Sequence, residues 1–263
     1  CAAPGVVSRY KETMRRLPHA VCLAVIGVLA LALAGWGDAA GKSSGASPLT
    51  VVAARTPPFP VPHYRTSGTY PQVRGGNADL KAVNAALRNA VLFHQREYAP
   101  YARKQKAKPY DRQIGVYRTD VDRRLLSAST VVVSALLPET EEDFPGQHGG
   151  DGWLPMTVRV PSGEPVAITQ LFTNPPQGLR ALATAWKAII RRTSAAPCLR
   201  AYHALYSSIP QYQDFALTPH GIAVGFWEQE VCYRLLAIVP YRIMRPYLSK
   251  LGATLVAGVR PAR

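Results

Sequence analysis

The sequence predicts an α+β fold with a mainly antiparallel sheet, two main packing helices and a short C-terminal helix. Three observations lead to this prediction. Segments rich in β-branched residues are separated by tight turns, which join antiparallel neighbours. Two longer segments carry apolar residues at steps of three and four, as helices with one buried face do. Strands and helices alternate irregularly, which is typical of α+β domains.

The N-terminal region has the pattern of an export signal. Met14, Arg15 and Arg16 precede the uncharged run AVCLAVIGVLALALAG, which is shorter than the roughly 20 apolar residues that a membrane-spanning helix needs. We expect residues 1–13 to be an upstream extension and residues 14–36 to be a signal peptide, with an uncleaved anchor as the alternative. Trp36 stands where a lipoprotein signal has its cysteine, so a lipid anchor is not expected.

The charge of the chain favours an acidic partner. Lys and Arg number 31 against 16 Asp and Glu, which gives a net charge of +15. An exported chain rarely meets nucleic acid, so we expect an extracytoplasmic protein, secreted or associated with the cell envelope, that binds an unknown protein or an anionic envelope polymer. Membrane contact is expected only through the N-terminal apolar segment if it stays uncleaved. The alternative is a basic surface that only keeps the protein in solution.

The exported part divides into a spacer and one domain. Residues 37–62 are small, polar and interrupted by proline, which is the composition of a flexible linker. Residues 63–258 are predicted to form the α+β domain, with an N-lobe of about 63–138 and a C-lobe of about 150–258.

In the first half of the domain a glycine turn precedes a helix, with Asn77 as a candidate N-cap. The residues expected on the buried face of this helix are Leu80, Val83, Leu87 and Val91. Residues 124–138 are rich in β-branched side chains and predict a buried strand. The acidic, glycine-rich stretch ETEEDFPGQHGGDG predicts a loop.

In the second half, residues 153–168 predict two strands joined at a tight turn in which Gly163 takes a positive φ. Residues 178–192 predict an amphipathic helix, whose aligned apolar residues are Leu179, Leu182, Trp186 and Ile189. A hairpin around Pro219–Gly221, a strand over 233–241 and a short helix that ends at Gly252 complete the domain.

Four stretches follow one another in a recognisable order: YPQVRGGNADLKAVNAAL, PGQHGG, WLPMTVRVPSGEPVAITQLF, and DFALTPHGIAVGFWEQEV with LAIVPYRIMRPYL. Together they resemble the extracytoplasmic domain of RsiV-type anti-sigma factors, a module also found in a mycobacterial secreted immunogenic protein and beside some cell-wall deacetylase domains. The resemblance runs from about residue 64 to residue 255.

This resemblance implies an exported sensor or binding module of otherwise unknown function. RsiV-type proteins hold a sigma factor with a cytoplasmic segment, and at most residues 1–19 are expected inside the cell here, so we expect no anti-sigma domain. The metal-ligand motifs of a deacetylase are not present. The sequence therefore favours a protein that is not an enzyme and that needs no cofactor.

Cys198 and Cys232 are the two cysteines of the exported part. In an oxidising compartment they predict a disulfide, which closes a loop of about 35 residues and stabilises the fold by roughly 3–4 kcal/mol. Two free buried thiols are the alternative. The histidines and cysteines have no metal-ligand spacing, so no metal site is expected.

His148 is the best catalytic candidate, because Asp143 and Asp151 lie near it in the sequence. A general base needs a partner that positions it, and a cell-wall-modifying hydrolase centred on His148 is the alternative to a binding module. A histidine between glycines in a structural turn is the simpler explanation.

The candidate binding residues lie in the segment YAPYARKQKAKPYDR, where tyrosines alternate with cations, a composition suited to protein interfaces and anionic glycans. They are Arg103, Lys104, Lys106, Lys108, Tyr98, Tyr101 and Tyr110. A solvated basic surface without a ligand is the alternative.

Overall fold

The computed structural model describes residues 49–76, 79–104, 115–143, 147–201, 214–226 and 234–261. The predicted upstream extension and signal peptide lie outside the described residues. Among the described helices, none combines the length and the apolar character needed to cross a membrane.

The larger sheet contains the described strands of the first half of the domain. They are β1 (Thr50–Arg55), β2 (Tyr64–Arg74), β3 (Gly115–Thr119), β4 (Leu126–Ala128), β5 (Val132–Asp143) and β6 (Gln147–Arg159). The order is β1-β2-β3-β5-β4, and β6 pairs with the other edge of β5. Only β2 and β3 are parallel; the other pairs are antiparallel. The predicted α+β class with a mainly antiparallel sheet is confirmed.

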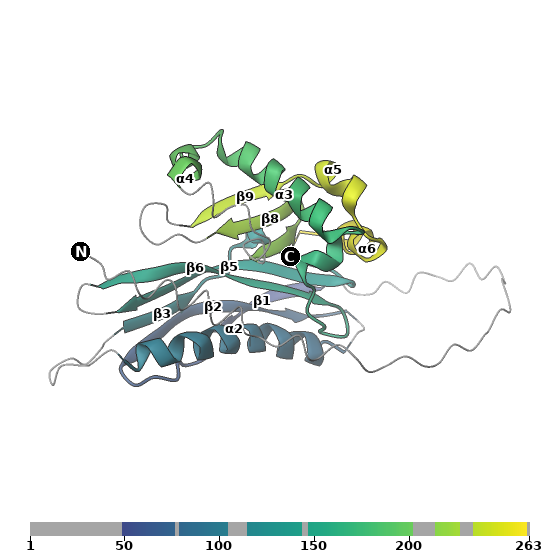
Figure 1. Ribbon diagram of the computed structural model, residues 1–263. Coiled ribbons are helices and arrows are strands. Elements are labelled where there is room, and N and C mark those ends of the chain that lie inside the picture. Colours follow the sequence, from purple (N-terminus) through teal and green to yellow (C-terminus); the bar gives the residue numbers. More distant parts are fainter. Residues whose placement is uncertain are drawn as a thin grey trace, which may run out of the picture. The chain divides into compact units, whose positions relative to one another are not determined.

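Helix α2 (Lys81–Ala102) covers one face of this sheet (Figure 1). The four residues predicted on its inner face are buried, and the first of them, Leu80, directly precedes the helix. The predicted N-cap Asn77 lies outside the described residues. The four buried residues meet the odd-numbered positions of β5 and the even-numbered positions of β6, because side chains alternate along a strand. The core residues from these two strands are Val133, Ala135, Leu137, Leu154, Met156 and Val158.

The smaller sheet and its helices lie on the opposite face of the larger sheet (Figure 1). Its antiparallel strands are β7 (Phe215–Thr218), β8 (Gly221–Phe226) and β9 (Leu235–Val239). The helical elements of this half are η2 (Ile168–Leu171), α3 (Pro175–Ile190), α4 (Ala196–Ala201), α5 (Tyr241–Met244), η5 (Arg245–Tyr247) and α6 (Lys250–Gly258). The predicted hairpin around Pro219–Gly221 and the final strand are confirmed.

Buried hydroxyl groups join the two sheets. Ser127 Oγ donates to the carbonyl oxygen of Leu217 in β7 at 2.6 Å, and Ser134 Oγ accepts from the Leu217 N–H at 2.7 Å. Ser134 Oγ is also 2.7 Å from Thr157 Oγ1. These side chains satisfy backbone groups of β7 that the ladder with β8 does not use.

Ser134→Ala is expected to lower the free energy of unfolding by about 1–3 kcal/mol, because it leaves the buried Leu217 N–H without an acceptor. Urea denaturation measures this change. Thr254→Ala, which removes an exposed hydroxyl from α6, is the control and should change stability by less than about 0.5 kcal/mol. Equal stability of the two variants would show that this hydroxyl does not support the junction.

The folded body begins earlier than predicted. Residues 37–62 were expected to be a flexible linker, but β1 pairs with β2 from Thr50↔Arg74 to Arg55↔Thr69. Phe59 and Val61 are buried in the core. The prolines on both sides of the segment TVVAAR favour a linker in the sequence. The segment is nevertheless a strand, because it pairs with β2. The domain therefore includes Leu49, not only the residues after position 62.

The stretch predicted as an acidic loop instead extends β5 and β6. Glu139 faces Gly152, and Glu141 faces Gly150. Glycine and acidic residues have weak strand propensity, but pairing in the sheet overrides it. The predicted boundary between the two lobes therefore falls inside one hairpin.

Three smaller predictions are corrected or refined. The strand expected over 124–138 is a hairpin of β4 and β5, because the Ser129 hydroxyl caps the turn between them. Gly163 has the predicted positive φ of 71°, but the segment after it forms only a bridge at Pro165. Gly252 does not end a helix: it lies in the first turn of α6, where a Cβ would come within 2.2 Å of the Leu171 carbonyl oxygen.

Helix α3 starts at Pro175, capped by Asn174, a few residues before the predicted start. Leu179, Leu182 and Trp186 are buried against the smaller sheet as predicted. Ile190 completes this buried face, and Ile189 is only half-buried.

Candidate functional site

The predicted binding segment is only partly available at the surface. α2 extends into it as far as Ala102, and Tyr98 is buried, with its ring centroid 5.8 Å from that of Phe59. Tyr98 therefore belongs to the core, because the helix turns it toward the sheet. Arg103 and Lys104 are exposed at the end of α2. The side chain of Tyr101, together with Lys106, Lys108 and Tyr110, lies outside the described residues.

His148 lies in β6, but its side chain and that of Asp143 are outside the described residues. Cys198 lies in α4, partly buried against the core, and Cys232 is not among the described residues. The Cys198–Cys232 disulfide and the catalytic role of His148 stay predictions.

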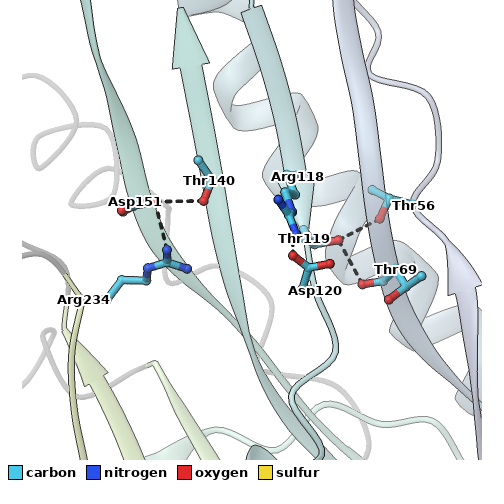
Figure 2. A network of polar contacts seen from close by, with 8 residues as sticks. All are labelled: Thr56, Thr69, Arg118, Thr119, Asp120, Thr140, Asp151 and Arg234. Atoms are coloured by element: carbon cyan, nitrogen blue, oxygen red, sulfur yellow. Dashed lines mark hydrogen bonds and ion pairs between the residues drawn. The ribbon is translucent and has the colours of Figure 1, made fainter.

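Asp151, the other neighbour of His148 in the sequence, has a structural role (Figure 2). It accepts a hydrogen bond from Thr140 Oγ1 at 2.8 Å and lies 3.3 Å from Arg234 Nη2. Arg234 precedes β9, so this pair connects the larger sheet to the smaller one. In a second set of contacts in Figure 2, the Thr119 hydroxyl of β3 lies 2.8 Å from the Thr56 hydroxyl, just after β1. It also lies 3.2 Å from the Thr69 carbonyl of β2, the parallel neighbour of β3.

A buried cluster of titratable groups lies between α2 and the larger sheet. Glu139 is 5% exposed and accepts hydrogen bonds from the Tyr117 hydroxyl at 2.5 Å and from His94 Nδ1 at 3.1 Å. Burial lowers the pKa of His94, but the hydrogen bond and the negative charge of Glu139 outweigh it, and the pKa lies above its ordinary value. A protonated imidazole donates to the carboxylate, as a structural ion pair does.

These groups do not form a metal site. Among the residues that the structure describes, no three His, Cys, Asp or Glu side chains converge in a way that would hold a metal ion.

Among the described residues, a group of cations without carboxylate partners lies on the helices beside the smaller sheet. We call this group the basic helical layer. It consists of the cations within α3, α5, η5 and α6 and of those that closely follow α3 and α6. They are Arg180, Lys187, Arg191, Arg192, Arg242, Arg245, Lys250 and Arg260. All are exposed except Lys187, which is half-buried. The described stretches 165–201 and 234–261 contain no Asp or Glu.

Three arginines in or next to the larger sheet have carboxylate partners. Arg118 pairs with Asp120 at 2.6 Å, Arg124 with Asp122 at 2.8 Å and Arg159 with Glu164 at 2.8 Å. Within the described part of the chain, the cations of the basic helical layer have no such carboxylate partner. Their charges are therefore available to a ligand.

Helix geometry aligns part of this layer into a row. Arg180, Lys187 and Arg191 are spaced by seven and four residues, so the last two lie within about 20° of Arg180 around the axis of α3. Trp186 and its apolar neighbours on the other face of α3 are buried against the smaller sheet, and this burial fixes the orientation of the helix. The row is thus held by the core.

A cleft opens beside the layer, where the start of α3 meets η5. Its volume is about 430 Å³, and its lining residues are Thr173, Asn174, Gln177, Pro246 and Tyr247. The lining side chains carry hydroxyl and amide groups but no charge.

The sequence analysis missed both the layer and the cleft. The cations are distributed over a long stretch and form no cluster in the sequence. The signal available was the lack of carboxylates from 165 to 201 and from 234 to 261. The cleft joins segments about seventy residues apart and has no sequence signature.

Comparison with known proteins gives structural neighbours only. No family model matches the chain, and no curated protein matches it. A member of the DUF3298 family from Bacteroides fragilis NCTC 9343 aligns with 82% of this chain and 98% of its own, with 11% identity and a TM-score of 0.44. A DUF3298 family protein from Pseudomonas aeruginosa PAO1 aligns with 78% of this chain and 95% of its own, with 12% identity and a TM-score of 0.46.

Both neighbours belong to an uncharacterised domain family. Likenesses of this size carry no argument about function, and the resemblance to RsiV-type anti-sigma factors stays a prediction.

Proposed function

We propose that this protein is an exported, non-enzymatic module that binds a phosphate-bearing anionic polymer of the cell envelope through the basic helical layer. The observation that supports the proposal is a set of exposed cations without carboxylate partners among the described residues. Most of these cations are arginines, whose planar guanidinium groups donate two parallel hydrogen bonds to a phosphate.

The spacing of the cations favours a polymer over a small anion. Arg180 and Arg191 are separated by roughly 16 Å along α3, at 1.5 Å per residue. Further cations lie on α5, η5 and α6. A single phosphate reaches only one or two of these side chains, whereas a chain of repeated negative charges contacts many of them.

Export is part of this proposal. The apolar run of residues 20–35 would carry the chain out of the cytoplasm, and a Cys198–Cys232 disulfide would form in the oxidising environment outside. An envelope polymer is a partner that only an exported chain can meet.

Replacing Arg180, Arg191, Arg242 and Arg245 together by glutamine is expected to weaken binding of poly(glycerol phosphate) at least tenfold at low salt. The reason is the loss of Coulomb attraction and of bidentate hydrogen bonds. Fluorescence titration of the purified protein measures the affinity, and affinity for the unmodified protein should fall as salt is raised.

The matched control removes the same charge from β2 and α2, with Arg65, Arg74, Lys81 and Arg88 replaced by glutamine. This variant is expected to bind within about twofold of the unmodified protein. An equal loss in both variants would show that net charge alone attracts the polymer and would contradict the proposal. Tighter binding of duplex DNA than of the polymer would assign the layer to nucleic acid instead.

A further inference from the structure

We infer that the cleft between the start of α3 and η5 binds a neutral polyhydroxylated unit, a sugar ring or a polyol, of the polymer held by the basic helical layer. This inference rests on the proposed function. It names the part of the polymer that the cations of the basic helical layer do not recognise.

Hydrogen bonds fix the two walls of the cleft relative to each other. The Thr173 N–H donates to the Tyr247 carbonyl at 3.0 Å, and Thr173 Oγ1 donates to the Leu248 carbonyl at 3.1 Å. One residue further along, the Ser249 N–H donates to the Leu171 carbonyl at 2.8 Å. The cleft is therefore present before a ligand arrives, which lowers the entropic cost of binding.

The polar groups of the cleft suit hydroxyl groups. Asn174 Oδ1 accepts from the Gln177 N–H at 3.2 Å as the N-cap of α3. Within the described residues, no hydrogen bond engages Asn174 Nδ2, the side-chain amide of Gln177 or the Tyr247 hydroxyl. Amides and hydroxyls both donate and accept, so they match the donors and acceptors of a polyol.

An aromatic ring completes the cleft. Tyr247 packs against the hydrophobic core and is only half-buried, so the core holds the ring while part of it borders the cleft. The C–H face of a sugar or polyol is apolar, and it can lie on this ring and on the exposed Pro246.

The same cleft is poorly suited to a phosphate. The start of a helix binds anions through free N–H groups, but α3 starts with Pro175 and Pro176, which have none. The next N–H, that of Gln177, is already bonded to Asn174. A neutral unit is therefore expected here.

Cations lie next to the cleft in the sequence. Arg245 directly precedes Pro246, and Arg180 is one helical turn after Gln177. A polymer in which neutral polyol units alternate with phosphates can place a phosphate at these cations and a neutral unit in the cleft.

The experiment compares two polymers of equal charge, poly(glycerol phosphate) and inorganic polyphosphate, which has no polyol. The double variant Tyr247→Ala, Gln177→Ala is expected to bind poly(glycerol phosphate) about tenfold more weakly and polyphosphate within twofold of the unmodified protein. The matched control is Phe93→Ala, Asn89→Ala, which removes an exposed ring and an exposed amide from α2 and should change neither affinity. Thermal melting confirms that each variant is folded.

An equal effect of the double variant on both polymers, or no effect on either, would overturn the inference while leaving the proposed function standing. If the unmodified protein binds neither polymer, the proposed function fails. The cleft is then judged by saturation-transfer NMR with methyl glucoside. Transfer that is lost in the double variant supports the inference, and no transfer from the unmodified protein overturns it.

Discussion

Replacing Trp186 by alanine is expected to lower the free energy of unfolding by about 3–5 kcal/mol. Trp186 is fully buried between α3 and the smaller sheet, and its ring centroid is 4.5 Å from that of Phe226. Its Nε1–H donates to the Val224 carbonyl at 3.1 Å. The substitution removes the largest side chain of this core and leaves a cavity, and guanidinium denaturation measures the loss.

Trp186→Phe separates the two contributions of this side chain. It keeps most of the ring contacts and loses the hydrogen bond to Val224, so it should cost about 1–2 kcal/mol, less than the alanine variant. If Trp186→Ala cost less than about 1 kcal/mol, α3 would not be anchored through this residue. The row of cations on α3 would then lack the support described above.

Asp214→Asn is expected to stabilise the protein by about 2–4 kcal/mol at pH 8 and to have little effect at pH 4. Burial raises the pKa of Asp214 to about 7 from an ordinary value of 3.8; the positive charge of His94 lowers it in part and the negative charge of Glu139 raises it. Between pH 3.8 and about pH 7, Asp214 keeps its proton in the folded protein but has lost it in the unfolded chain. Stability therefore falls as pH rises from 4 to 7, and above pH 7 the folded state carries the cost of charging the half-buried Asp214 carboxylate.

Asparagine has nearly the same shape and no charge, so this cost disappears in the variant. Denaturation midpoints at pH 4 and pH 8 measure the difference. His94 contributes a slope of the same sign, because its raised pKa gives stability that is present below about pH 6.5 and is lost as pH rises. In Asp214→Asn the free energy of unfolding should still fall as pH rises, and this remaining pH dependence should decrease when His94→Gln is added. If Asp214→Asn were no more stable than the unmodified protein at pH 8, the Asp214 carboxylate would be solvated in the folded state.

The elements that the sequence predicted well are those whose signal is local. The buried face of α2 follows from the spacing of Leu80, Val83, Leu87 and Val91, and the positive φ of Gly163 follows from a tight turn. The elements that it mispredicted depend on distant partners. β1 exists because β2 pairs with it, and the acidic end of β5 is a strand because β6 and β3 flank it. Local propensity contains no information about such pairing.

The candidate site illustrates the same limit. Tyr98 has the composition of an interface residue, but its position on α2 turns it into the core. The cations of the basic helical layer are ordinary surface residues one by one. They become a candidate site because the fold brings helices from two distant segments onto the same small sheet, with no carboxylate among their described residues.

Strand β5 contributes to the core on both of its faces. Val133, Ala135 and Leu137 pack under α2, while Val132 and Leu136 pack toward the second sheet. Loss of this one strand would remove the support of both halves at once. The protein should therefore unfold in a single cooperative step, and neither half would survive as an independent fragment.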